Sequence, residues 1–530
     1  MAGSTLVGCA KQSGKPQGPR PNIIFILIDT LRADRLGAYG STENLTPVMD
    51  RLASNGVLFE RANAAAPWTL PSMASLFSGF YPGVHHATDY KAVSGHEDGA
   101  GEVRVFSEQF DTLAERLRDA GYDTAAFVAN PFIIPRHGFA QGFDRFDHRF
   151  KGNTTPGKVL NDLAARWIQQ RDANKPFFLY IHYMDPHAPY SPYRIARRVV
   201  QPMVERVADR AQHTRISSAE RNEYRNYFRK SMKGYSALPL HKELRNTVEY
   251  WRARYDAGVR QTDMFLADLR RQLGRAGVWK DALVVVTADH GEALGEHRLW
   301  SHGMSAYQNQ LHVPLILRWP DHFAPMRIHA TVRMFDVTPT ILDYLELGSF
   351  EAMQAESLRS LIDGTSSADR TAFAEAVNKH PDLRAVILGD WKLLADVAGE
   401  DPPRLFNLAE DPGELRDLAD AEPERVKTML AALGVQTAEN RELGKDIEVR
   451  TAKLEGEDVS KLRDIGYAGG TDDGEEDAKA NDHAESQPAD SRPAETQAAD
   501  HDPNEPNPRP RRQPRGRPAP AALLSDNRAS

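Results

Sequence analysis

The fold class follows most directly from the stretch Asn22-Ile23-Ile24-Phe25-Ile26-Leu27-Ile28. This almost unbroken run of apolar residues, many of them β-branched, predicts a central parallel strand that is buried on both faces. Asp29 and Thr30 follow it, and open α/β sheets hold their ligands at the carboxyl ends of such strands. A carboxylate in that position is costly unless it is paired or bound to a metal ion. Asp29 is therefore the first candidate for a functional site.

Three further apolar runs predict buried strands, at residues 177–183, 282–288 and 313–317. Residues 124–129 predict a shorter strand. Helical patterns separate the strands, at residues 46–56, 110–120, 158–170, 255–273 and 338–345. This alternation predicts an α/β fold with a mostly parallel sheet that is covered on both faces.

A second notable stretch is Ala66-Pro67-Trp68-Thr69-Leu70-Pro71-Ser72-Met73. Pro67 and Pro71 restrict the backbone on both sides of Thr69, which predicts that the hydroxyl lies in a stiff loop and not inside a helix. A short helix should follow and end at Gly79. Because a helix N-terminus favours negative charge, Thr69 is well placed to act as a nucleophile. A proline-flanked turn with an N-capping hydroxyl explains the same residues without catalysis.

The composition limits the classes of function. A chain of 530 residues has room for one large domain, a smaller one and tails. Its net charge of −8 gives no case for nucleic acid as a main partner. No apolar run is long enough to span a bilayer. Cys9 is the only cysteine, which excludes disulfides within the chain.

Cys9 also suggests a location. Leu6-Val7-Gly8-Cys9 has the small-residue pattern of a bacterial lipoprotein cleavage box, and residues 11–21 read as a polar tether. The charged and apolar parts of a signal peptide should come before it, so we expect a start upstream, a lipid on Cys9 and a place in the bacterial envelope or periplasm. Without such a start the protein would be cytoplasmic. An idle or buried thiol is the alternative.

The chain divides into four predicted parts: a tether at 1–20, a main domain at 21–347, a smaller subdomain at 348–467 and a disordered tail at 468–530. Within the main domain, the basic segment 194–245 is either a helical excursion over the site or a solvated helical face. Short strands at 384–388 and 391–395 predict an antiparallel sheet in the subdomain.

The candidate site residues follow strands that can end at one crevice. Asp29, Asp289 and His290 offer two carboxylates and an imidazole, a set that suits one divalent ion such as Ca²⁺, Mn²⁺, Mg²⁺ or Zn²⁺. A hydroxyl beside that ion would become acidic enough to act as a nucleophile. His187 and His302 are further imidazoles on loops, suited to protonating a leaving oxygen or binding an oxyanion.

These residues belong to a longer pattern that resembles the sulfatase family, within the alkaline phosphatase superfamily. The matching segments run in consistent order through residues 21–34, 45–59, 67–82, 178–190, 287–297, 300–303, 313–315, 391–394 and 405–412. The resemblance implies an alkaline-phosphatase-like α/β sandwich, a small C-terminal α+β subdomain with a four-stranded antiparallel sheet, and a metal-dependent ester hydrolase site.

The resemblance also implies residue roles. By position, Asp29, Asp289 and His290 would bind the metal ion, and Thr69 would be the nucleophile that also touches it. His187 resembles the acid that protonates the leaving group. His302 stands where sulfatases usually keep a lysine that contacts the sulfate, so it is expected to bind substrate and assist catalysis.

This chain departs from the family pattern at several positions. Typical sulfatases carry Cys or Ser, any residue, Pro, any residue and Arg, and they oxidise the first residue to formylglycine. Here the same register reads Thr69-Leu70-Pro71-Ser72-Met73. Thr30 replaces a second aspartate. The lysine and histidine expected after the second strand are absent, and Asn130 is the polar residue left there to bind substrate.

These departures change the expected chemistry. A hydrated formylglycine releases sulfate by elimination, whereas a sulfate ester of threonine cannot be released in this way. A phosphothreonine can be released by attack at phosphorus. Losing Arg and Lys weakens the positive field, which favours a singly charged phosphodiester or phosphonate ester, either small or linked to a glycan or lipid. The alternatives are a true sulfatase without formylglycine and an envelope-tethered binding protein; no protein partner is inferred.

Overall fold

The computed structural model describes residues 20–92, 101–150, 155–188, 190, 248–378, 380, 382–454, 458 and 462. The predictions for the lipid tether, the excursion at 194–245 and the tail at 468–530 fall outside these residues, apart from Arg20 at the tether's end. Within the described part of the chain, no helix combines the length and the apolar character needed to cross a membrane.

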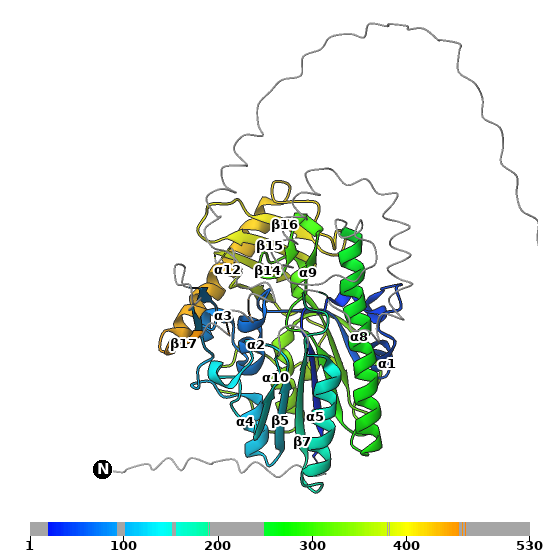
Figure 1. Ribbon diagram of the computed structural model, residues 1–530. Coiled ribbons are helices and arrows are strands. Elements are labelled where there is room, and N and C mark those ends of the chain that lie inside the picture. The colour runs from blue at the N-terminus through cyan, green and yellow to red at the C-terminus, as the bar shows by residue number, and fades with distance from the viewer. Residues whose placement is uncertain are drawn as a thin grey trace, which may run out of the picture. The chain divides into compact units, whose positions relative to one another are not determined.

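An eight-stranded sheet forms the centre of the protein, in the order β12-β2-β11-β8-β1-β7-β5-β6 (Figure 1). The bounds are β1 Ile23–Ile28, β2 Val57–Asn63, β5 Asp123–Val128, β6 Arg145–His148, β7 Phe177–Tyr183, β8 Leu283–Thr287, β11 His312–Arg318 and β12 Met326–Arg333. Strand β1 pairs in parallel with β7 on one side and β8 on the other. Only β11, among these eight, runs antiparallel to its neighbours. The prediction of a mostly parallel α/β sheet is confirmed.

Helices cover the sheet so that every residue of β1 is buried. One group packs together and consists of α1 Pro47–Ser54, α5 Gly157–Gln170 and α8 Val248–Arg275. Another group surrounds α2 and consists of α2 Thr69–Ser78, α3 Pro82–His85 and α10 Val337–Tyr344. The other α-helices in the described part of the chain are α4 Leu113–Asp119, α9 Gln308–Leu311, α11 Arg359–Ile362 and α12 Pro423–Gly444.

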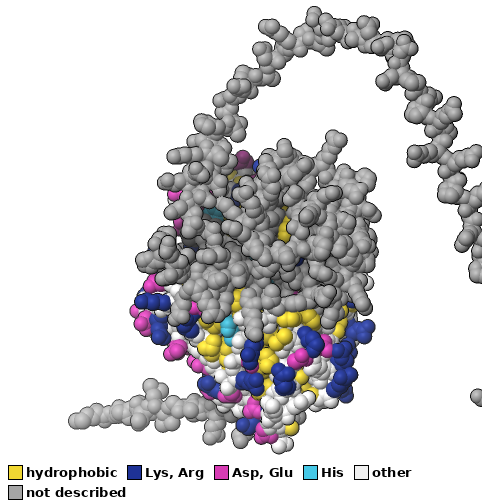
Figure 2. All heavy atoms as spheres, viewed as in Figure 1, with side chains coloured by type: hydrophobic (Ala, Val, Ile, Leu, Met, Phe, Trp, Pro, Cys, Tyr) yellow, Lys and Arg dark blue, Asp and Glu magenta, His cyan; other side chains and the backbone are white. Residues whose placement is uncertain are grey.

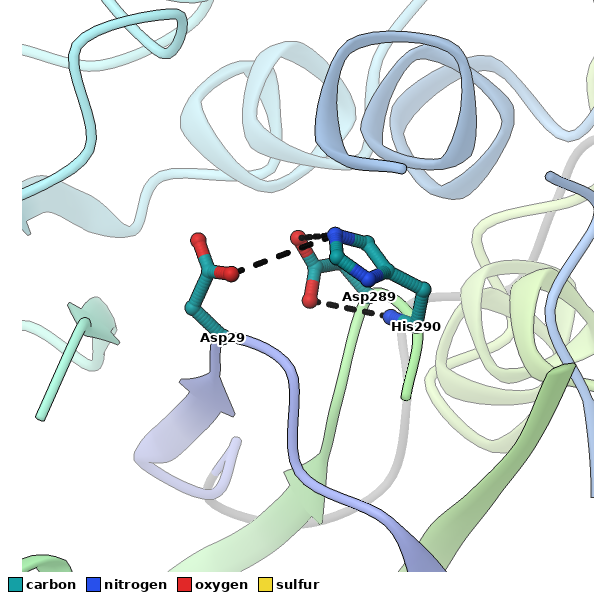
Figure 3. Close-up of side chains that lie close together, drawn as sticks. All are labelled: Asp29, Asp289 and His290. Atoms are coloured by element: carbon teal, nitrogen blue, oxygen red, sulfur yellow. Dashed lines mark hydrogen bonds and ion pairs between the residues drawn. The ribbon is translucent and has the colours of Figure 1, made fainter. Parts of the chain in front are cut away.

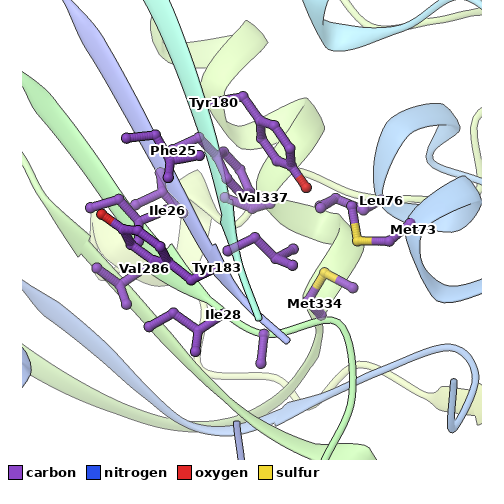
Figure 4. Packing of buried hydrophobic residues seen from close by; sticks show 14 of the residues in the cluster. Phe25, Ile26, Ile28, Met73, Leu76, Tyr180, Tyr183, Val286, Met334 and Val337 are labelled. Atoms are coloured by element: carbon purple, nitrogen blue, oxygen red, sulfur yellow. The ribbon is translucent and has the colours of Figure 1, made fainter. Parts of the chain in front are cut away.

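Helix α2 is anchored in the main core. Figure 4 shows Met73 and Leu76 of this helix pointing toward Tyr180 of β7 and toward Met334. All ten residues of α2 are buried. Burying apolar surface on this scale fixes the position of the helix, and therefore of its first residue, against the sheet.

A smaller antiparallel sheet follows toward the C-terminus, in the order β13-β14-β15-β16. Its strands are β13 Ala372–Ala374, β14 Leu383–Leu388, β15 Trp391–Asp396 and β16 Arg404–Asn407, and α12 packs on the middle two. Two minor sheets pair β9 Ala293–Leu294 with β10 Trp300–Ser301, and β4 Gly101–Arg104 with β3 Tyr90–Ala92 and β17 Thr451–Leu454. The predicted C-terminal four-stranded sheet is therefore confirmed.

Candidate active site

Thr69 is the first residue of α2, so the prediction that it lies in a loop outside a helix is wrong. Pro71 is compatible with the helix because it stands in the first turn, where its missing N–H would have no partner within the helix. Trp68 is extended and precedes the helix, and Gly79, with a φ of 77°, ends it as predicted. Thr69 is thus placed at the N-terminal end of a buried helix.

Asp29, Asp289 and His290 come together at the carboxyl ends of β1 and β8, and their side chains point toward one another in Figure 3. One potential ligand atom from each residue lies within 4.8 Å of the other two. The imidazole Nε2 of His290 is 3.3 Å from Asp289 Oδ2 and 3.9 Å from Asp29 Oδ1. All three side chains are fully buried.

Each carboxylate uses one oxygen to hold its position. Asp289 Oδ1 accepts hydrogen bonds from the backbone amides of Thr30, at 3.2 Å, and His290, at 2.9 Å. Thr30 reaches it from a left-handed backbone conformation with a φ of 59°, which is unusual for a β-branched residue and typical of functional sites. Asp29 Oδ2 accepts from Asn130 at 2.6 Å and lies 3.3 Å from His182 Nε2.

The other oxygen of each carboxylate is left for a ligand. Asp29 Oδ1 and Asp289 Oδ2 are buried without a hydrogen-bond partner among the described residues. In His290, Nδ1 donates to the carbonyl of Gly291 at 2.9 Å, so Nε2 is the nitrogen that can bind a cation once it gives up its proton. Metal-binding histidines are oriented in the same way by a hydrogen bond from their second nitrogen. Two anionic oxygens and one imidazole nitrogen therefore fit a divalent cation.

The local field also favours positive charge between these residues. Burial alone would raise the pKa of Asp29, but His187, His182 and His290 hold it well below its ordinary value. Burial lowers the pKa of His290, yet the carboxylates of Asp289 and Asp29 outweigh that effect and raise it to about 9. The same negative potential would stabilise a bound divalent cation.

The Thr69 hydroxyl borders this centre. Its Oγ1 is 3.3 Å from His290 Nε2 and 3.5 Å from Asn130 Nδ2. Asn130 thus contacts both the hydroxyl and Asp29, while its Oδ1 accepts from the amide of Phe132 at 2.8 Å. The amide side chain positions the hydroxyl relative to the carboxylate.

The two additional histidines lie beside the same centre. The ring centroid of His302 is 4.5 Å from that of His290 and 4.9 Å from that of His187. His302 Nδ1 is 3.0 Å from Glu292 Oε1, and both side chains are buried. Burial lowers the pKa of His302 to about 3, so its ring is neutral at pH 7. All the residues predicted for the site are therefore gathered around one point, namely Asp29, Thr69, Asn130, His187, Asp289, His290 and His302.

Sequence reasoning did not identify His182 and Glu292. His182 is the one polar imidazole within the otherwise apolar and aromatic β7, and this interruption was the available signal. Its Nδ1 is 3.1 Å from the hydroxyl of Tyr180. Glu292 follows His290 after one glycine and is fully buried, but the burial of a charged residue in a loop cannot be predicted from the sequence.

Met73 explains one of the departures noted in the sequence. Its side chain is fully buried in the main hydrophobic cluster. It provides packing where an arginine would bring a charge, so the centre has a weaker positive field than the motif with arginine would give.

Comparison with known proteins gives a consistent result. The profile of the sulfatase family matches residues 21–347. A second profile, of the C-terminal part of N-sulphoglucosamine sulphohydrolase, matches residues 295–440.

Individual relatives agree with the profiles. Arylsulfatase K of Xenopus laevis is 25% identical over 466 residues, which cover 78% of this chain and 82% of that protein. N-acetylglucosamine-6-O-sulfatase of Bacteroides thetaiotaomicron is 24% identical, covering 79% and 86% of the two chains. The crystal structure of phosphonate monoester hydrolase of Agrobacterium radiobacter shares the fold, with a TM-score of 0.61, 21% identity, and 79% and 96% of the two chains covered.

Proposed function

The chain belongs to the sulfatase family of ester hydrolases, and from this premise we propose that it uses Thr69 directly as the nucleophile on a phosphodiester or phosphonate ester. One observation carries the proposal: the Thr69 hydroxyl lies beside the buried cluster of Asp29, Asp289 and His290. In this proposal these three residues hold one divalent ion.

The divalent ion, when bound, would lower the pKa of the Thr69 hydroxyl and offset the negative charge that develops on the phosphoryl oxygens. The protein supplies the remaining parts. Asn130 orients the hydroxyl through its amide group. The helix N-terminus at Thr69 adds a partial positive charge on the same side.

The reaction takes two steps. Thr69 Oγ1 forms a bond to phosphorus as the bond from phosphorus to the leaving oxygen breaks; the hydroxyl proton is released to solvent, and His187 gives a proton to the leaving alkoxide. Water then attacks the phosphothreonine, His187 takes a proton from it, the bond from phosphorus to Oγ1 breaks, and Oγ1 takes back a proton from solvent. This sequence restores Thr69 and uses His187 as acid and then as base.

His302 is proposed to bind the ester. Its neutral ring lies against His290 and His187, where it borders the ester without adding a full charge. Together with the buried Met73, this arrangement favours a singly charged ester over a dianionic monoester.

The decisive test is turnover of a bis-aryl phosphate by the metal-loaded protein. We expect Thr69→Ala to reduce kcat by at least about 1,000-fold, since removing a nucleophile removes the covalent route. The metal content should not change. Thr69→Ser is the matched control because it keeps a hydroxyl, and it should retain measurable turnover. Full activity in Thr69→Ala would eliminate the proposal.

A second candidate is a sulfuric ester hydrolase that works without formylglycine. The names of the relatives favour it, because arylsulfatase K and N-acetylglucosamine-6-O-sulfatase are both sulfatases. Comparing kcat/KM on an aryl sulfate with that on the matching aryl phosphate diester separates the two candidates. Faster turnover of the sulfate would favour the second.

A further inference from the structure

A cleft of about 580 Å³ lies at the end of the central strands that is opposite to the active site. It is lined by α1, the last turns of α8, the turn at residues 277–280, and Arg318 at the end of β11. Arg318 pairs with Val284 near the start of β8, whereas Asp289 follows the end of β8. The cleft and the active site are therefore at opposite ends of the same strand.

The cleft is strongly basic. None of the described residues that line it is a carboxylate, and five have cationic side chains: Arg51, Arg270, Arg271, Lys280 and Arg318. Arg271 forms an ion pair with Asp268. Within the described residues the other four form no ion pair. Burial lowers the pKa of Arg318, and Arg270 lowers it further against the opposing effect of Asp281. Arg318 donates to the backbone carbonyls of Trp279, at 3.4 Å, and Lys280, at 3.2 Å, but no carboxylate among the described residues pairs with it.

Helix stability accounts for only part of this charge. Arg51 in the last turn of α1, and Arg270 and Arg271 near the end of α8, interact favourably with the helix dipoles. Lys280 is in a turn and Arg318 ends a strand, so this explanation does not extend to them. Several separate segments contribute charge to one concave surface, which is typical of an anion-binding site. Figure 2 shows Lys and Arg side chains close together at the lower right, where α8 and α1 lie in Figure 1.

The N-terminal segment enters the structure beside this cleft. The carbonyl of Asn22 accepts a hydrogen bond from the amide of Leu283 at 2.9 Å, and Leu283 follows Lys280 by three residues. The residues between Cys9 and Arg20 could span at most about 40 Å. If the N-terminal segment were attached to a membrane, it would hold this end of the sheet close to that membrane.

We propose that this cleft binds the phosphate groups of anionic lipid headgroups, so that this edge of the protein faces a membrane and the active site faces away from it. Four cations that form no ion pair with the described residues supply the attraction, and the concave shape admits a headgroup. The active site would then be open to esters on the side away from the lipid. In this proposal the cleft binds anionic headgroups whether or not Cys9 carries a lipid.

The test uses the full, unlipidated chain and vesicle sedimentation. Vesicles of phosphatidylcholine with 30% phosphatidylglycerol are compared with pure phosphatidylcholine, at low and high salt. Each cation near an anionic surface raises affinity about fivefold, so the double variant Arg270→Glu/Lys280→Glu should bind at least about 25-fold more weakly. Both residues are exposed, so the fold should persist. Lys427→Glu/Arg441→Glu on α12 changes the net charge equally and is the matched control.

We expect the wild type and the control to bind the anionic vesicles, with affinity that falls as salt rises, and to ignore the neutral ones. Turnover of a soluble ester should be the same in all three proteins. Equal binding by the two double variants, or no binding by the wild type, would overturn the proposal. Binding of inorganic phosphate without any binding to vesicles would overturn it as well, because the cleft would then be a site for free anions.

Discussion

At the scale of single residues, the central feature is a secondary alcohol in a place where the family usually carries a residue that it oxidises. Thr69 cannot yield the aldehyde, and Met73 in the core replaces the arginine of the same motif. The surroundings that serve a nucleophile are nevertheless present. The free oxygens of Asp29 and Asp289 and the Nε2 of His290 form the proposed cation site beside the hydroxyl.

Glu292 is expected to act as a positioning residue for His302, because its carboxylate holds Nδ1 at 3.0 Å. Replacing it by Leu, which fills a similar volume, should lower kcat on the bis-aryl phosphate by about 10–100-fold. Glu292→Gln keeps an acceptor for Nδ1 and should recover most of that loss. If Gln and Leu reduce kcat equally while the free energy of unfolding is unchanged, the positioning role is wrong.

Asp185 predicts a dependence of stability on pH. Burial raises its pKa to about 7, against the effect of hydrogen bonds from Gln261 and Gly157. Since the folded pKa is above the unfolded value of 3.8, the folded state holds a proton that the unfolded state has lost between these values. The stability contribution is therefore full below the unfolded pKa and is lost as the pH rises toward 7.

The measurement is urea unfolding of the wild type and Asp185→Asn at several pH values from 4 to 8. Relative to the variant, the wild type should lose up to about 1.4 kcal/mol of unfolding free energy per pH unit up to pH 7, and no more above it. Asn cannot titrate, so it removes the effect while keeping the size of the side chain. A constant difference across this range would show that Asp185 is not buried as described.

At the scale of elements, the sequence predicted the strongly patterned segments well. Strand β7 matches its predicted bounds, and β1, β8 and β11 match within one or two residues. Long apolar runs of this kind are stable only in the core, so they predict buried strands well. Strand β2 was missed, since Glu60 and Arg61 interrupt its apolar pattern. Helix α12 was missed because it is mostly exposed and has only a narrow apolar face.

The site was predictable for a related reason. The proposed metal ligands follow within three residues of strands whose positions were clear, so the topology brought them together. Asn130, expected to bind substrate, contacts Asp29 and Thr69, and the binding role itself stays a prediction. His182 and Glu292 depend on contacts between distant segments, to Asp29 and His302, that no local pattern contains.

The C-terminal end of α2 depends on a glycine in a left-handed conformation, and replacing that glycine tests how the helix end packs. Gly79 has a φ of 77°, and a Cβ there would lie 2.6 Å from Met353. Gly79→Ala should therefore lower the free energy of unfolding by about 2–3 kcal/mol, from backbone strain and from displacement of Met353. Gly121→Ala is the control, because its φ of 91° is similar but none of the described residues would lie within 4 Å of the added Cβ. Equal losses would mean that Met353 moves away at no cost.

At the scale of the whole molecule, the proposed active site and the basic cleft lie at opposite ends of the sheet. Residues at the carboxyl ends of β1 and β8 form the proposed hydrolytic centre, and the opposite end of these strands carries the basic cleft beside Asn22. A parallel sheet produces this division because the strands of the site all end on one side. The smaller C-terminal sheet belongs to the same compact unit as the main one.

The most direct test of the account is calorimetric titration of the metal-stripped protein with Mn²⁺. We predict one ion per chain, at least about 100-fold weaker binding in Asp29→Asn and Asp289→Asn, and little change in Thr69→Ala or in the exposed control Asp111→Asn. Binding of the ion by Asp289→Asn with the affinity of the wild type would contradict the claim that this cluster holds the ion that activates Thr69.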